Sequence, residues 1–473
     1  MRRLDGSAAL IVALLVPLTG LPRRSASGAE VGLELARSSV SSGQSLAYVR
    51  GLTADGPRLT GSAAYQRAAE WSADQFRAMG ITQVALEPFT IEHGWERVSA
   101  RARIVAPADR PIRVASLGWS PSTPEGGIDA EVVALGAFSP DALPARGALQ
   151  GRIALLPDGD PPGDSDTAAH ARLALAVALR AAGAIAILSA DSDPADQLSA
   201  RGFTFSTAIG ALPAAQVGRG DAESIRRSLA RGAVRMSLEL INRITPGAAI
   251  VNNVIAGISG RDRPDQWVLV GAHLDSWDFG TGAQDNATGV ARVLEAARAI
   301  AALRQAPRRS IRFALWGGEE QGQLGSTAYA RAHSAELDRL VATLNSDAGT
   351  GRIIGWTAPG RDDLIRAVRP LTRDVLGELG AATFDESLRY AFQSDGAPFI
   401  LAGIATLDLN ADDTHYEEIH HKAADTIDRV DARHLSIGGA VVAATAYAIA
   451  DAAGPMPPRL DRRLVEQLLK RGR

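Results

Sequence analysis

The chain has 473 residues, of which 46% are hydrophobic, 22% are charged and 5% are aromatic, and it contains 47 Gly, 24 Pro and no Cys. This composition excludes a collagen-like chain, a disulfide scaffold and a disordered protein, and the length indicates two or three globular units. The formal net charge is −3, and only Lys422 and Lys470 among the 50 cationic residues are lysines, so no basic block indicates a nucleic-acid surface.

The N-terminal segment, residues 1–29, has the three-part layout of a secretory signal. Arg2 and Arg3 form a basic flank, an apolar run covers residues 8–16, and small residues follow near the end. The apolar stretch is shorter than the ~20 residues that a membrane span needs. We therefore expect an exported protein, periplasmic or extracellular, without a stable membrane anchor; an uncleaved N-terminal anchor is the alternative.

Three further segments differ in their patterns. Residues 60–91 predict a helix that ends near Gly80 and a strand after it. At residues 98–241, short apolar runs are separated by Pro, Gly and Asp, which indicates a separate small α/β or β-rich unit. The last residues, 455–473, contain three Pro and a basic end, and we expect a loose tail there.

From Val251 onward, apolar strands alternate with helical stretches. The expected strands lie at residues 267–271, 311–316, 340–344 and 404–409. This alternation predicts βαβ units around a mostly parallel sheet, and so an α/β fold. An apolar helix at residues 432–452 is expected to pack on that sheet.

Acids and histidines stand where ligands bind in such sheets, just beyond the carboxyl ends of the strands. Most of them directly follow an expected strand, one precedes a helix, and two lie in a later loop. The candidates are His273, Asp275, Asp285, Glu319, Glu320, Asp347, His420 and His421. Histidine and carboxylate ligands suit zinc or a similar divalent ion, and two adjacent ions fit this set better than one.

Each candidate also has an ordinary structural explanation. A histidine at a strand end is usually a satisfied polar residue, adjacent glutamates on a loop are usually solvated, and an aspartate before a helix often caps it. The joint occurrence of five such residues in this order favours a metal site over five separate structural roles.

Four segments, HLDSWDFGTGAQDNATGVA, WGGEEQGQLGS, NSDAG and HHKAADT, occur in this order. Together they resemble the co-catalytic zinc exopeptidases of the aminopeptidase and glutamate carboxypeptidase type, and the resemblance covers most of residues 45–450. It implies a zinc exopeptidase fold, a mostly parallel mixed sheet flanked by helices, interrupted by a protease-associated-like domain. The expected organisation is a signal at 1–29, a catalytic domain at 30–97 and 242–454, an inserted domain at 98–241 and a tail at 455–473.

The resemblance also assigns roles, beginning with two zinc ions per chain. The implied zinc ligands are His273 and Asp347 for one ion, Glu320 and His421 for the other, and Asp285 as the bridge. Glu319 would be the general base that activates a metal-bridging water. Asp275 would accept the second imidazole N–H of His273. A cis peptide is implied between Asp285 and Asn286.

Three more residues are candidates with open alternatives. His420 stands where some relatives have a tyrosine that binds the oxyanion, so we expect that role; packing or capping is the alternative. Ser394 and Asp395 lie in a segment that resembles a loop lining the substrate pocket. Asp395 would pair with the α-amine of the substrate, and a turn role is the alternative.

The implied function is a secreted or periplasmic di-zinc metallo-exopeptidase that hydrolyses dipeptides or short peptides with a free N-terminus. Relatives of this type form homodimers, so a homodimer is a further expectation. Two alternatives remain open, a single-zinc glutaminyl cyclase-like acyltransferase and a catalytically inactive receptor-like binding protein. Two, one or no zinc ions per chain would distinguish the three.

Overall fold

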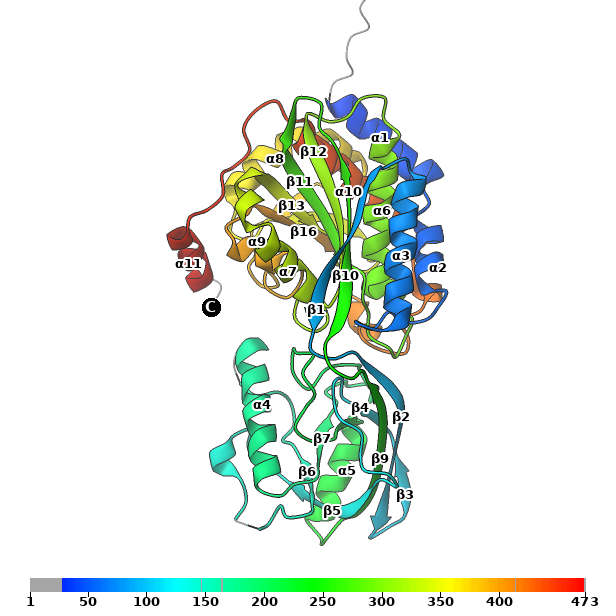
Figure 1. The fold of residues 1–473 in the computed structure, drawn as a ribbon, viewed down its shortest axis with the longest axis vertical. Helices are drawn as coiled ribbons and strands as arrows, with labels where there is room; N and C mark the ends of the chain where they lie inside the picture. Colours follow the sequence, from blue (N-terminus) through cyan, green and yellow to red (C-terminus); the bar gives the residue numbers. More distant parts are fainter. Residues whose placement is uncertain (1–27, 146, 163–164, 413, 472–473) are drawn as a thin grey trace, which may run out of the picture.

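The computed structural model describes residues 28–471 except 146, 163–164 and 413. The expected signal at 1–29 therefore lies almost entirely outside the described residues, and the described chain begins with helix α1 (Gly28–Ser42). Figure 1 shows two units stacked along the long axis of the molecule, each built around its own sheet.

The first unit contains an eight-stranded sheet in the order β1-β10-β12-β11-β13-β16-β14-β15. Its strands are β1 (Gln83–Ile91), β10 (Ala249–Ile258), β11 (Arg263–His273), β12 (Arg309–Trp316), β13 (Leu340–Asn345), β14 (Ile353–Thr357), β15 (Thr383–Asp385) and β16 (Thr406–Ala411). The four adjoining strands β12, β11, β13 and β16 run parallel, whereas β10 and β14 flank them antiparallel. This confirms the mostly parallel mixed sheet, and the four adjoining parallel strands are those that the sequence predicts; β14 and β15 form a further parallel pair at the edge.

Helices cover both faces of this sheet (Figure 1). Their bounds are α2 (Ser45–Thr53), α3 (Ala63–Ala78), α6 (Thr288–Ala301), α7 (Leu324–Ala332), α8 (Asp362–Glu378), α9 (Ala397–Leu401) and α10 (Ala432–Asp451). Alternate residues of β11 point to opposite faces: Val268 and Val270 join the core formed with α6 and α10, whereas Trp267 and Leu269 join a core with residues of α7 and α9. Helix α10 is long and apolar enough to cross a membrane, but most of it is buried here as a core helix.

The second unit contains a sheet in the order β3-β2-β9-β5-β6-β7-β8-β4. Its elements are β2 (Trp95–Ala106), β3 (Arg110–Ile112), β4 (Val114–Ser116), β5 (Ile128–Ala134), β6 (Ile153–Leu155), α4 (Ser165–Ala181), β7 (Ala186–Ala190), β8 (Ala214–Val217), α5 (Arg219–Leu229) and β9 (Arg235–Ile244). The sheet thus extends three residues beyond the expected boundaries at 98 and 241.

Two short connectors, residues 92–94 and 245–248, join the units. They lie side by side, because the N–H of Thr245 donates to the carbonyl of Gly94 at 2.9 Å. Strand β1 ends at the first connector, and β12 runs in the same direction as β1 because both are antiparallel to β10. The carboxyl ends of the parallel strands therefore face the second unit.

The expected loose tail is wrong for most of its length. Helix α11 (Arg462–Arg471) forms there, and its Val465 and Leu468 are buried, the latter in a cluster with Ile400. The main chain before it is also held, since the N–H of Leu460 donates to the carbonyl of Gly403 at 2.8 Å. The apolar residues of this segment recur at helical spacing. The sequence interpretation gave more weight to the prolines before the helix than to this spacing.

Candidate metal centre

The predicted ligands come together at the carboxyl edge of the parallel strands. His273 is the last residue of β11, Glu320 follows β12 in a tight loop, and Asp347 follows β13. Asp285 lies in the loop that leads into α6, and His421 comes from the segment before α10. Neighbouring parallel strands end at one edge, so residues far apart in the sequence meet there.

Asp285 lies between two imidazoles. Its Oδ1 is 3.2 Å from Nε2 of His273, and its Oδ2 is 3.3 Å from Nε2 of His421. The same nitrogen of His273 is 3.3 Å from Oδ1 of Asp347, and that of His421 is 2.9 Å from Oε2 of Glu320. The site therefore contains two sets of donor atoms that share one carboxylate. The peptide between Asp285 and Asn286 is cis, as the resemblance implies.

The donor chemistry fits divalent cations. Glu319 and Glu320 are each only 8% exposed, and Oε1 of Glu320 is buried without a hydrogen-bond partner among the described residues. Burial, with the neighbouring charge of Asp285, raises the pKa of Glu320 to about 7. Burial and three nearby acids raise the pKa of Glu319 well above its usual range. Buried carboxylates this crowded require compensating positive charge, and bound cations would supply it.

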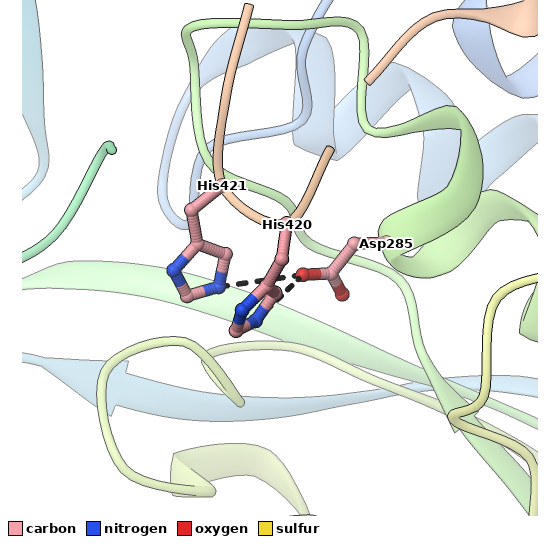
Figure 2. Close-up of side chains that lie close together, drawn as sticks. All are labelled: Asp285, His420 and His421. Carbon is pink, nitrogen blue, oxygen red and sulfur yellow. Dashed lines mark ion pairs between the residues drawn. The ribbon is translucent and has the colours of Figure 1, made fainter. Parts of the chain in front are cut away.

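His420 reaches the same site from beside His421 (Figure 2). Its Nε2 is 3.6 Å from Oδ2 of Asp285, and its ring stacks on Tyr416 with 5.0 Å between the centroids. Burial, together with the charge of His421, lowers the pKa of His420, which favours the neutral imidazole. Donor atoms of Asp285, His420 and His421 lie within 4.8 Å of one another. His420 is therefore a candidate ligand as well as a candidate oxyanion donor, an alternative that the sequence interpretation missed.

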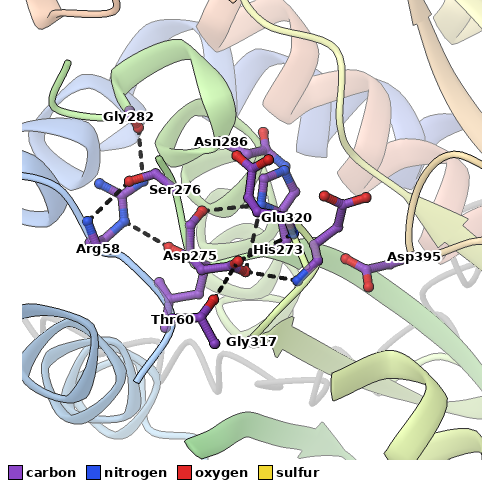
Figure 3. Close-up of polar contacts among 12 residues, drawn as sticks. Arg58, Thr60, His273, Asp275, Ser276, Gly282, Asn286, Gly317, Glu320 and Asp395 are labelled. Atoms are coloured by element: carbon purple, nitrogen blue, oxygen red, sulfur yellow. Dashed lines mark hydrogen bonds and ion pairs between the residues drawn. The ribbon is translucent and has the colours of Figure 1, made fainter. Parts of the chain in front are cut away.

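Asp275 differs from its expected role in one respect. Nδ1 of His273 meets the main-chain carbonyl of Asp275 at 3.1 Å, whereas the carboxylate oxygen is 3.8 Å away. The carboxylate is occupied elsewhere, since it accepts hydrogen bonds from Oγ1 of Thr60 at 2.7 Å and from the N–H groups of Glu319 and Glu320 at 3.2 and 3.3 Å (Figure 3). Asp275 thus orients His273 through its main chain and the Glu319 loop through its side chain.

Two further residues hold the loop that carries Asp285. The buried guanidinium of Arg58 donates to the carbonyls of Leu274 at 2.7 Å and Gly282 at 2.8 Å (Figure 3). The carboxylate of Asp425 accepts the N–H of Asp285 at 3.2 Å. The sequence interpretation missed both. Asp425 stands inside the motif HHKAADT, whereas no local pattern marks Arg58, which is more than 200 residues from its partners.

Ser394 and Asp395 lie beside the site with different partners. Oγ of Ser394 donates to Oδ2 of Asp347 at 2.7 Å, so this serine holds a predicted ligand. Asp395 is 1% exposed and accepts a hydrogen bond from Ser326, and its Oδ2 has no hydrogen-bond partner in the described part of the chain. Burial raises the pKa of Asp395 to about 8.

Comparison with known proteins indicates the family to which the chain belongs. Residues 253–446 match the model of peptidase family M28. Carboxypeptidase Q from Bos taurus is 32% identical over 406 residues, 85% of this chain and 84% of the relative, and that from Homo sapiens is 30% identical with the same coverage. The structure of a peptidase M28 precursor from Shewanella amazonensis SB2B is 31% identical with a TM-score of 0.78, covering 92% of this chain and 99% of that one.

The fold is shared more widely. A zinc aminopeptidase from Bacillus subtilis is 24% identical and superposes with a TM-score of 0.66, covering 85% of this chain and 94% of that one. The fold, the site and these relatives together define a metallopeptidase. Within that class, the chain belongs to peptidase family M28.

The metal-free protein is expected to lose stability as the pH rises from 5 to 8. Burial raises the pKa of four carboxyl groups to about 7 or 8, those of Glu320, Asp395, Asp408 and Asp425. Between pH 5 and 8 the folded protein thus binds more protons than the unfolded chain, so the free energy of unfolding falls as the pH rises. The raised pKa values of His273 and His421 act in the same direction.

Each unit of pKa difference corresponds to about 1.4 kcal/mol, so the Tm of chelator-treated protein should fall by about 5 °C or more over this range. Asp285, whose pKa is lowered by His273 and His421 against the effect of burial, acts in the opposite direction only below about pH 4. Excess zinc should raise the Tm more at pH 8 than at pH 5, because it competes with protons for the same atoms. A pH-independent Tm of the metal-free protein would contradict the raised pKa values of these buried carboxyl groups.

Proposed function

We propose that this protein is an exported di-zinc metallo-exopeptidase that hydrolyses dipeptides or short peptides with a free N-terminus. The observation that carries the proposal is the position of Asp285, whose two oxygens face the imidazoles of His273 and His421. A carboxylate shared by two donor sets suits a pair of divalent cations. We assign His273 and Asp347 to one zinc ion and Glu320 and His421 to the other, with Asp285 as the bridge.

Bound zinc would supply an acidified water and a Lewis acid. The proton transfer is assigned to a side chain of the protein. Glu319 is assigned as the general base, which takes a proton from the attacking water and passes it to the leaving amine. Nε2 of Gln323 donates to its Oε1 at 3.3 Å and helps to orient it. His420 is assigned to the oxyanion, with metal ligation as its alternative.

Asp395 is assigned to the α-amine of the substrate, because its free Oδ2 lies near the acids of the site. Replacing Asp395 by Asn should raise KM for unblocked dipeptides by about tenfold or more, since a charge-assisted hydrogen bond is lost. Steady-state kinetics measure this, with the exposed Asp374→Asn on α8 as the matched control. An unchanged KM would instead favour a purely structural role of Asp395 in the turn.

The proposal as a whole is tested by a substrate panel and by metal analysis. Unblocked dipeptides, N-blocked dipeptides and longer peptides are assayed with added zinc, and only the unblocked substrates should be cleaved efficiently. Two zinc ions per chain support the peptidase, one supports the glutaminyl cyclase-like alternative, and none supports the inactive binding protein. The metallopeptidase relatives weigh against both alternatives.

The domain at 98–241 has a proposed role in substrate choice. It faces the carboxyl edge of the catalytic sheet, which supports its interpretation as an inserted protease-associated-like domain. A cover at this position would favour short peptides over long chains.

A further inference from the structure

A loop of the second unit, residues 191–200, contacts the segment that carries His421. The N–H of Ala200 donates to the carbonyl of His421 at 2.7 Å. The ammonium of Lys422, the next residue, forms an ion pair with Asp193. Both side chains of this pair are less than a tenth exposed, so the contact is buried between the two units. The loop from the second unit thus holds the main chain of the proposed zinc ligand His421 and the side chain of the residue that follows it.

The 191–200 loop has internal hydrogen bonds that fix its shape. The carboxylate of Asp191 accepts the N–H groups of Asp193 at 2.9 Å and Ser199 at 2.8 Å. Asp193 in turn accepts the N–H of Ala195 at 2.6 Å. These hydrogen bonds within the loop fix the positions of the Asp193 carboxylate and the Ala200 N–H, the two groups that contact the first unit.

The main chain of His421 needs such support. Its φ is 57°, in the left-handed region that few residues other than Gly adopt, although His enters it more often than most side chains. A conformation of this kind persists only where its surroundings impose it. The main-chain bond from Ala200 and the ion pair at Lys422 act directly on this residue and the next one. The ring of His421 also meets the edge of Trp277, which packs against Trp119 of the second unit.

We propose that the 191–200 loop is a built-in part of the metal centre, in which Asp193 and Lys422 are positioning residues for His421. The inference rests on the di-zinc function proposed above. It makes the affinity of the Glu320–His421 zinc site dependent on the second unit, while the His273–Asp347 site depends on the first unit alone. The second unit then sets metal occupancy as well as access to the edge of the sheet.

The test is a zinc titration of Asp193→Asn against wild type, in the presence of a competing chelator. The substitution removes the charge that pairs with Lys422, but an amide oxygen can still accept the N–H of Ala195, so the loop keeps its fold. We expect one zinc to bind as in wild type and the affinity for the other to fall by about tenfold to a hundredfold. Asp196→Asn is the matched control, because Asp196 lies in the same loop but pairs with Arg113 of the second unit.

Two further variants separate positioning from folding. Lys422→Met should weaken the same zinc site, and Lys422→Arg should restore much of its affinity because the charge returns. The double variant Asp193→Asn with Lys422→Met leaves no unpaired buried charge, so it should fold while it still binds the second zinc weakly. Circular dichroism of the metal-free proteins checks the fold.

The outcomes are distinguishable. Two zinc ions bound with wild-type affinity by folded Asp193→Asn and by the double variant would overturn the positioning role and leave the proposed function intact. Fewer than two zinc ions in the wild-type protein would instead overturn the proposed di-zinc function itself. Equal losses at both zinc sites would also contradict the inference, because they would indicate a general effect on stability.

Discussion

Replacing Glu319 by Gln is expected to lower kcat by about 10³-fold or more while the zinc content stays unchanged. An amide cannot accept the proton of the attacking water, and general acid–base catalysis contributes about 10² to 10⁴ in rate. Glu319 belongs to neither donor set, so the metal ions should remain. Its main-chain N–H, held by Asp275 at 3.2 Å, is unaffected by the substitution, so the loop should keep its position.

Kinetics with an unblocked dipeptide and metal analysis of the same preparation measure both quantities. Glu466→Gln is the control and should match wild type, because the exposed Glu466 side chain pairs with Arg462 on the surface of α11. Retained activity in Glu319→Gln would refute the assigned base. Lost zinc would show that Glu319 is itself a ligand.

Replacing Asp285 by Asn should weaken both of the proposed zinc sites at once and lower activity by about 10³-fold or more. The carboxylate offers one oxygen to each imidazole-containing set, whereas an amide offers a single neutral oxygen. Loss of the shared ligand therefore affects both ions, in contrast to Asp347→Asn, which should affect mainly the site of His273.

Zinc stoichiometry at a fixed chelator concentration measures this difference. The exposed Asp338→Asn, which alters only a surface ion pair with Arg459, is the matched control. If Asp285→Asn still bound one zinc with wild-type affinity, Asp285 would be a ligand of a single ion and the site would not be bridged. That result would favour a single-zinc enzyme.

The sequence predicts the centre of the first sheet well, because its parallel strands are continuous apolar runs. It also predicts that three of the proposed metal donors lie close together, since His273, Glu320 and Asp347 directly follow these runs and parallel strands end at one edge. Asp285 and His421 are also candidates from the sequence, but their assignment as bridge and ligand depends on the family resemblance. Their approach to the strand residues is a tertiary contact that no local pattern encodes.

The residues that hold the site residues in place could not be predicted from the sequence for the same reason. Thr60 meets Asp275 across 215 positions of sequence, and Ala200 meets His421 across two units. A hydrogen bond of this kind depends on the final packing, and either partner alone looks like an ordinary polar or small residue. The side-chain partner expected for His273 was replaced by a main-chain carbonyl, because the Asp275 carboxylate has three better-placed donors.

The chain enters and leaves the second unit at neighbouring points, because the connectors pair at Gly94 and Thr245. A segment that enters and leaves at neighbouring points can be exchanged between homologous proteins by two cuts, and a short turn could close the gap if it were removed. Its loop to His421 limits that freedom. If the proposed role of the 191–200 loop holds, a chimaera with a foreign loop should bind one zinc and bind the other weakly, so grafts into this scaffold should retain the native loop.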